Sequence, residues 1–304
     1  MSEQVVENSI LETIGRTPLV KIGRMNPNNR VTLMAKIESA NPSGSLKDRV
    51  ACYIISKAEE EGALSKDKTI LESTSGNMGI SLAMVAAVKG YRVAVTLLES
   101  ASIEKRNLLE GYGVKVFLIP TEKGPDGARD EAMRLYKQYP EKYFLVGQNF
   151  NKNNVLAHYE TTGREIWKDT NGEVDCFVAG IGTSGTIIGV GKRLKEMNPK
   201  VKIIGVEPYP NHKVYGLKNL EQSRIPEIYD RRWVDEIVKV SDEEAIITAR
   251  DLVRKEGILA GISSGAVMFA ALQKIKVLDK GNVVVLLADS GERYLSTGFY
   301  TGKV

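Results

Sequence analysis

Short apolar segments alternate with longer helical segments along this chain, and this alternation constrains the fold more than any other feature. The apolar segments are typical of strands buried on both faces, because they lack regular polar alternation. They cover residues 31–38, 68–72, 92–98, 114–120, 174–181, 201–207 and 282–288. Helical patterns cover residues 46–63, 80–90, 102–113, 126–139 and 185–197. The sequence SDEE at 241–244 fits a capping box that starts a further helix. The pattern predicts an α/β fold with mainly parallel sheets.

The strand–helix pattern runs twice, once from Glu38 to Val146 and again after Gly147. A chain of 304 residues with 42% apolar content can bury a core in each of two such units. Clefts between units of this kind are common ligand sites. We therefore expect two open α/β domains that face a shared cleft.

Charge and composition exclude several classes of function. The net charge of +4 arises from 42 basic and 38 acidic residues, and no basic run is interleaved with aromatic residues, so we expect no nucleic-acid partner. His158 and His212 are the only histidines, Cys52 and Cys176 the only cysteines, and none has a partner at zinc spacing, which predicts no metal site. Two cysteines form no disulfide framework, and no apolar run is long enough to span a bilayer. We expect a cytoplasmic protein without a membrane partner.

Two glycine-rich turns lie where an expected strand gives way to a helix, the edge at which parallel α/β sheets bind ligands. They are STSGNMG at residues 73–79 and GIGTSGT at residues 180–186. Helix N-termini offer free N–H groups and a partial positive charge, so they bind anions. The hydroxyls of Thr183, Ser184 and Thr186 add donors to the second turn, which predicts a site for a phosphate monoester.

The second turn also matches the dinucleotide motif G-x-G-x-x-G at Gly180, Gly182 and Gly185. Glu207 follows at roughly the 20-residue distance at which such motifs place an acid for the ribose. An NAD-dependent oxidoreductase is therefore an alternative interpretation. The hydroxyls between the glycines suit a terminal phosphate better than a pyrophosphate.

A lysine lies at an unusual place in NPSGSLKDR, residues 41–49. Ser45 is a candidate N-cap and Lys47 falls in the first helical turn, whereas cations favour the opposite end of a helix. Lys47 is either a solvated lysine or an amine with a lowered pKa that forms a Schiff base. Two anion sites and such an amine together suit pyridoxal phosphate with an amino-acid substrate.

Seven motifs then suggest a family: GRTPLVKI, NPSGSLKDR, TSGNMG, GTSGT, TTGREIW, EGILAGISSGA and SGERYLSTG. Together, and in this order, they resemble cysteine synthase (O-acetylserine sulfhydrylase) and its relatives, including cystathionine β-synthase. These are fold-type II pyridoxal-phosphate enzymes and usually homodimers. The resemblance implies an N-terminal substrate-loop domain of residues 1–12 and 37–147. It implies a C-terminal domain of residues 13–36 and 148–304 that holds the cofactor phosphate.

The resemblance also implies roles for individual residues. Lys47 would form the internal aldimine and take the Cα proton. Asn77 would bond the ring oxygen of the cofactor, and the neutral hydroxyl of Ser263 would meet its pyridine nitrogen and favour β-elimination. Thr74 and Ser75 would bind the substrate carboxylate, Ser75 also as a catalytic residue. The cofactor phosphate would be held by Gly182, Thr183, Ser184, Gly185 and Thr186.

The implied reaction is β-replacement on a three-carbon amino acid through an aminoacrylate, as when O-acetylserine and sulfide give cysteine. The chain departs from the family pattern at Met78, where a threonine is usual, so Met78 either contacts the substrate or packs away from it. Gln148 is the expected second ligand of the substrate carboxylate. Asn149 is the alternative, because the family glutamine directly precedes a phenylalanine, and here Asn149 precedes Phe150 while Gln148 lies one place earlier.

A third departure is the stretch at residues 216–230, which replaces a shorter glycine-rich stretch and carries three acids. Glu221 or Asp230 is a candidate general base that activates water, while exposed loop carboxylates are usually only solvated. Addition of water would make the protein an L-cysteine lyase that releases sulfide and leaves serine, and a second thiol would give lanthionine. This lyase is the alternative to cysteine synthesis.

Overall fold

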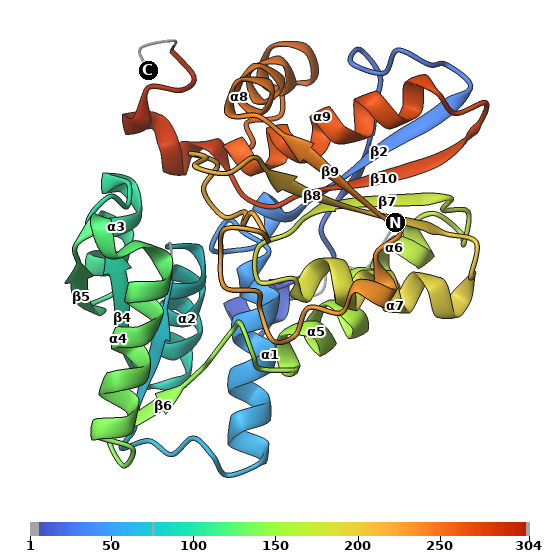
Figure 1. The fold of residues 1–304 in the computed structure, drawn as a ribbon. Coiled ribbons are helices and arrows are strands. Elements are labelled where there is room, and N and C mark those ends of the chain that lie inside the picture. The colour runs from blue at the N-terminus through green and yellow to red at the C-terminus, as the bar shows by residue number, and fades with distance from the viewer. Residues whose placement is uncertain (1–5, 75, 302–304) are drawn as a thin grey trace.

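Two β-sheets organise the computed structural model, which describes residues 6–74 and 76–301 (Figure 1). The large sheet has the order β1-β2-β10-β7-β8-β9 and the small sheet the order β5-β4-β3-β6. The large sheet contains β1 Leu19–Ile22, β2 Val31–Ile37, β7 Cys176–Gly180, β8 Lys202–Pro208, β9 Glu236–Val240 and β10 Gly281–Leu287. The small sheet contains β3 Thr69–Ser73, β4 Arg92–Leu98, β5 Lys115–Ile119 and β6 Tyr143–Leu145. Only the β1–β2 pair is antiparallel among the strand pairs of the described residues, which confirms the predicted mainly parallel α/β fold.

Helices cover both faces of each sheet (Figure 1). On the large sheet, α8 and α9 pack on one face and α7 on the other. On the small sheet, α1 and α2 pack on one face and α4 on the other. The α-helices are α1 Lys47–Glu60, α2 Asn77–Lys89, α3 Ile103–Gly111, α4 Gly124–Gln138, α5 Asn153–Ala157, α6 Gly163–Asp169, α7 Gly185–Met197, α8 Asp242–Asp251 and α9 Ile262–Lys276. No helix among the described residues is both long and apolar enough to cross a bilayer.

The remaining helical turns are short and of the 3-10 or π type. They are η1 Ile10–Thr13, η2 Glu38–Ala40, η3 Thr121–Lys123, η4 His158–Thr162, η5 Arg231–Trp233, η6 Leu252–Glu256 and η7 Gly291–Thr297. The π-helix η4 lies between α5 and α6, and η7 follows β10. Both border the candidate site.

All the predicted strands and helices are present, and the capping box is confirmed. Ser241 Oγ accepts the N–H of Glu244 at 3.3 Å, and the Glu244 carboxylate accepts the N–H of Ser241 at 2.8 Å. The sequence did not indicate β1, β6 or β9. Strand β6 has only three residues, and β9 reads EIVKV, in which charges interrupt the apolar run.

Both predicted turns connect a strand to a helix. The first runs from the end of β3 to the start of α2, and the second from the end of β7 to the start of α7. Strand β2 pairs with β10 in a parallel register that aligns Val31 with Gly281. The N-terminal strands thus belong to the large sheet, whereas the predicted domain boundaries stay a prediction.

Candidate active site

Lys47 is the first residue of α1, which stands between the small sheet and the helices of the large sheet (Figure 1). The predicted N-cap was one residue off, because Leu46 is the cap and Ser45 Oγ accepts the N–H of Lys47 at 3.3 Å. Lys47 is only partly exposed, and withdrawal of its amine from bulk water lowers the pKa of Lys47 to about 8 against the opposing pull of Glu72. A large fraction of the amine is therefore neutral near pH 8.

Glu72 ends the buried part of β3, and the sequence interpretation did not include it. Its side chain is 2% exposed, and its carboxylate accepts the N–H groups of Ser73 at 2.8 Å and Gln148 at 3.0 Å. Burial raises the pKa of Glu72 to about 7, although these N–H groups and Lys47 favour the charged form. In the sequence, the one indication of a role for Glu72 is its position as a carboxylate at the end of an apolar strand.

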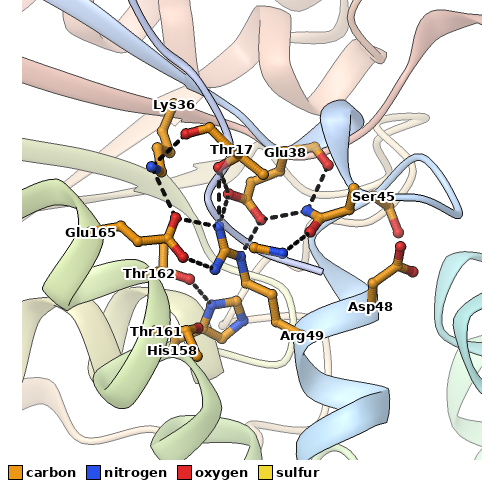
Figure 2. Close-up of polar contacts among 12 residues, drawn as sticks. Thr17, Lys36, Glu38, Ser45, Asp48, Arg49, His158, Thr161, Thr162 and Glu165 are labelled. Carbon is orange, nitrogen blue, oxygen red and sulfur yellow. Dashed lines mark hydrogen bonds and ion pairs between the residues drawn. The ribbon is translucent and has the colours of Figure 1, made fainter. Parts of the chain in front are cut away.

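A buried ion-pair network fixes the start of α1 on the large sheet (Figure 2). Arg49 Nε lies 2.7 Å from Glu38 Oε2, and Arg49 Nη1 lies 2.6 Å from Glu165 Oε1. The ammonium of Lys36 lies 2.9 Å from the same Glu165 carboxylate and 2.9 Å from that of Asp169. Since Arg49 and Glu38 have fully buried side chains, each needs the other for compensation.

The residue after Lys47 connects α1 to the small sheet. The Asp48 carboxylate accepts the N–H of Ser43 at 2.7 Å and the hydroxyl of Ser81, in α2, at 2.5 Å. The turn before α1 and the body of α2 therefore share one buried acceptor. Lys47 is held from both sides, through Arg49 toward the large sheet and through Asp48 toward the small one.

The first turn, between β3 and α2, is tightened by Thr74. Its buried Oγ1 accepts the N–H of Gly76 at 2.9 Å and that of Gly79 at 3.4 Å, which leaves the hydroxyl proton free to be donated. Gly76 has φ +128°, a conformation that favours glycine. Asn77 begins α2. Ser75 lies outside the described residues, so its predicted role stays a prediction.

Met78 lies in the apolar core of the small sheet and is 1% exposed. The structure thus favours the packing alternative that the sequence left open. A substrate contact of Met78 stays a prediction.

The second turn, between β7 and α7, is a backbone cradle. A Cβ on Gly182 would lie 2.4 Å from the carbonyl oxygen of Gly216, and one on Gly185 would lie 2.0 Å from Asn154 Oδ1. Ser184 caps α7 with φ +73°, and its buried Oγ has no hydrogen-bond partner among the described residues. A helix N-terminus, close backbone and a buried hydroxyl that lacks a partner together fit a phosphate group.

Two side chains from the preceding helices support this turn. Asn154, in α5, donates from Nδ2 to Thr183 Oγ1 at 3.0 Å. His158 is fully buried, with Nε2 3.1 Å from Thr186 Oγ1 and Nδ1 3.0 Å from Thr162 Oγ1. Burial holds the pKa of His158 well below its ordinary value, so the neutral ring donates to one hydroxyl and accepts from the other.

The two serines in the first turn of α9 differ in their hydrogen bonds. Ser264 Oγ accepts the N–H of Ala288 at 3.0 Å, which ties it to the end of β10. Ser263 is 5% exposed and is not part of that bond. This arrangement favours Ser263 over Ser264 for a contact with the cofactor ring, and the contact stays a prediction.

The two candidate carboxylate ligands lie just after β6. Gln148 Nε2 donates to the carbonyl of Ser73 at 2.9 Å, so its amide lies against the first turn. Asn149 Oδ1 is buried and has no hydrogen-bond partner among the described residues. The contact with the first turn favours Gln148, and either role stays a prediction.

The stretch at residues 216–230 lies partly over the second turn. Gly216 and Leu217 contact the backbone of that turn, whereas the acids further along form ion pairs. Glu221 pairs with Lys239 at 2.7 Å, and Asp230 pairs with Arg232 at 2.7 Å. The hydrogen bond from Arg232 lowers the pKa of Asp230. Neither carboxylate forms a hydrogen bond with the residues around Lys47 that the structure describes, and the predicted general base stays a prediction.

Glu207, the candidate ribose ligand of the dinucleotide alternative, is 3% exposed. Its carboxylate already accepts the N–H of Leu220 at 3.0 Å. The geometry therefore gives the oxidoreductase alternative no support.

Comparisons with known proteins agree with this geometry. Residues 10–289 match the family model of the pyridoxal-phosphate dependent enzymes. A cysteine synthase of Aquifex aeolicus is 41% identical over 303 residues, which cover 97% of this chain and 93% of the relative. The cysteine synthase structure of Entamoeba histolytica superposes with a TM-score of 0.93 at 38% identity, covering 100% of this chain and 94% of that one.

A hydrogen sulfide-producing enzyme from Fusobacterium nucleatum is also similar. Its structure has a TM-score of 0.90 and 40% identity, and the match covers 95% of this chain and 100% of that one. The predicted family, fold type and cofactor are all confirmed by these matches. With its motifs in order, its two mainly parallel sheets and these full-length matches, the chain belongs to the cysteine synthase family of fold-type II pyridoxal-phosphate-dependent enzymes.

Proposed function

We propose that this protein catalyses β-replacement on a three-carbon amino acid and forms cysteine from O-acetylserine and sulfide. The observation that carries the proposal is the half-buried amine of Lys47, with a pKa of about 8, in the field of the buried carboxylate of Glu72. The amine belongs to α1, which packs against α2 at the first candidate anion turn and against α5, whose Asn154 contacts the second. Such an arrangement suits a substrate with a carboxylate and a cofactor with a phosphate.

Pyridoxal phosphate supplies an electron sink for the substrate Cα when it is bound. The N–H groups at the start of α7 and the hydroxyl of Ser184 would hold its phosphate. His158 holds the Thr186 hydroxyl in place for the same phosphate. The glycines at positions 182 and 185 let the backbone approach closely, because a side chain at either would collide with neighbouring atoms.

Lys47 would take the Cα proton at Nζ. A general base works best when its pKa lies near the working pH, and burial brings the pKa of Lys47 to about 8. The Glu72 carboxylate favours the charged amine, so it would stabilise the ammonium that forms. The Thr74 hydroxyl and the Gln148 amide would hold the substrate carboxylate over the N-terminus of α2.

A second candidate function is the release of sulfide from L-cysteine by replacement of the thiol with water or a second thiol. The full-length match to the hydrogen sulfide-producing enzyme of Fusobacterium nucleatum favours it. Addition of water would need a base, for which Glu221 and Asp230 stay candidates.

Product analysis separates the two functions. The purified enzyme with bound cofactor receives either O-acetylserine with sulfide or L-cysteine alone. Cysteine formation without sulfide release from cysteine supports the first function. Sulfide release with serine or lanthionine, and little cysteine formation, supports the second. No product in either reaction, from enzyme whose visible absorbance shows bound cofactor, contradicts both.

The predicted assembly and location also belong to this proposal. We expect a homodimer in the cytoplasm, as the resemblance implies. Light scattering on the purified protein would test the dimer, and a mass near the 33.4 kDa of a single chain would contradict it.

A further inference from the structure

A buried polar cluster surrounds the side chain of Asn77 at the N-terminus of α2. Asn77 Nδ2 donates to Asp289 Oδ2 at 2.7 Å, and Arg293 Nη1 donates to Asn77 Oδ1 at 2.6 Å. The same Asp289 oxygen accepts the hydroxyl of Tyr294 at 2.6 Å. Asp289 is 1% exposed and Arg293 is 5% exposed, so both groups act away from bulk water. Asp289 follows β10 and Arg293 belongs to η7, so the cluster joins the large sheet to the helix of the small one.

The two partners leave only one orientation for the amide. A guanidinium can only donate hydrogen bonds, and a carboxylate can only accept them. Turning the Asn77 amide over would place its NH₂ against Arg293 and its oxygen against Asp289, with both hydrogen bonds lost. The usual ambiguity between the oxygen and nitrogen of an asparagine therefore does not arise here.

The fixed orientation determines what Asn77 can offer a ligand. Arg293 occupies Oδ1, and Asp289 takes one of the two Nδ2 hydrogens. The second Nδ2 hydrogen remains, so the side chain presents a donor to its surroundings. A lone donor suits an anionic oxygen, such as the ring oxygen of pyridoxal phosphate.

The charge of Asp289 is balanced within the same cluster. Lys105 is 2% exposed, and its Nζ lies 4.1 Å from the centre of the Tyr294 ring. Burial lowers the pKa of Lys105 to about 8, and the nearby Asp289 acts in the opposite direction. The nearby Lys105 therefore offsets part of the charge of the buried carboxylate.

We propose that Asp289 and Arg293 are positioning residues that fix the Asn77 amide with its free N–H toward the ring oxygen of the cofactor. The proposal rests on the predicted contact between Asn77 and that oxygen. It adds two residues that act through Asn77 and need touch neither cofactor nor substrate.

The test compares Asp289→Asn in the normal protein and in an Asn77→Ala background. An asparagine at 289 offers both a donor and an acceptor, so Arg293 alone still orients the Asn77 amide and a turned-over amide loses only one hydrogen bond. The measurements are the cofactor dissociation constant and the visible absorbance of the bound cofactor as a function of pH, both without substrate. Loss of one hydrogen bond to a charged group predicts a roughly tenfold weaker affinity for Asp289→Asn and an altered absorbance titration. Arg293→Lys, which keeps a donor, should change both less than Arg293→Met.

Tyr294→Phe is the matched control, because it removes a bond to the same oxygen of Asp289 but leaves both partners of the amide. It should keep the normal affinity and absorbance titration. In the Asn77→Ala background, Asp289→Asn should have no further effect. An equal effect in both backgrounds, or a normal titration in Asp289→Asn, would overturn the proposal.

If Asn77→Ala alone changes neither measurement, the contact with the ring oxygen is absent and the inference fails with it. The proposed reaction is unaffected by that outcome, because neither measurement involves an amino-acid substrate.

Discussion

Replacing Glu72 by Gln is expected to change how the stability of the cofactor-free protein depends on pH. Burial raises the pKa of Glu72 from 4.5 to about 7. Between these pH values the folded protein keeps a proton that the unfolded chain has released. The free energy of unfolding therefore falls as the pH rises through this window. The contribution is complete below pH 4.5 and lost above about pH 7.

The size of the effect follows from the shift. A change from 4.5 to about 7 corresponds to about 3 kcal/mol of the free energy of unfolding. Glutamine has nearly the same shape but does not titrate, so the Glu72→Gln protein should lack this decline. Glutamine keeps one acceptor oxygen, so it loses only one of the two hydrogen bonds from the N–H groups of Ser73 and Gln148, and its neutral amide adds no pH dependence. Other titrating groups, such as His158, contribute to both proteins and cancel in the comparison.

The assay is urea unfolding of both cofactor-free proteins at several pH values between about 4.5 and 7.5. The difference in free energy of unfolding should change by about 3 kcal/mol across this range, in the direction that favours the variant at higher pH. The same unfolding measurement on the Lys47→Met protein provides a second comparison. Removal of the cation should raise the pKa of Glu72 further and extend the decline to higher pH. Parallel pH profiles for the normal and Glu72→Gln proteins would refute the reasoning.

Three further substitutions test other parts of the site. Gly185→Ala places a Cβ 2.0 Å from Asn154 Oδ1, so the cofactor dissociation constant, measured by fluorescence titration, should rise at least roughly tenfold, and an unchanged value would contradict the phosphate role. Met78→Thr puts a hydroxyl into the apolar core and should cost roughly 2–4 kcal/mol in urea unfolding, whereas normal stability with a changed substrate preference would point to a substrate contact. Arg49→Met leaves the buried Glu38 carboxylate without its cation and should cost about 3–5 kcal/mol, and equal stability would show that the network is dispensable.

The fold could be predicted from the sequence because the buried parallel strands are continuous apolar runs. Hydrophobic periodicity does not indicate which strands pair with each other. It therefore could not show that β1 and β2 belong to the large sheet. The short β6 and the charge-interrupted β9 carry too weak a pattern for prediction.

The sequence predicts candidate site residues where the chemistry lies within a few consecutive positions, as in the two turns and at Lys47, and their roles stay predictions. Asn154 and His158 were missed because their roles come from partners 29 and 28 positions away. Glu72 and Asp289 share a local signal, since each is a carboxylate at the end of an apolar run that forms a buried strand. Acids at such positions therefore indicate a site at the carboxyl edge of a parallel sheet, where strands that are distant in sequence meet.

The pairing of Val31 with Gly281 also determines the order in which this protein can assemble during synthesis. The strands of the small sheet all lie between Thr69 and Leu145, so that sheet can form early. Strand β2 has to wait for β10, and until then the edge of a buried apolar strand is open to pairing with other chains. The nascent chain should therefore depend most on chaperones in the interval between completion of the small sheet and emergence of β10 from the ribosome.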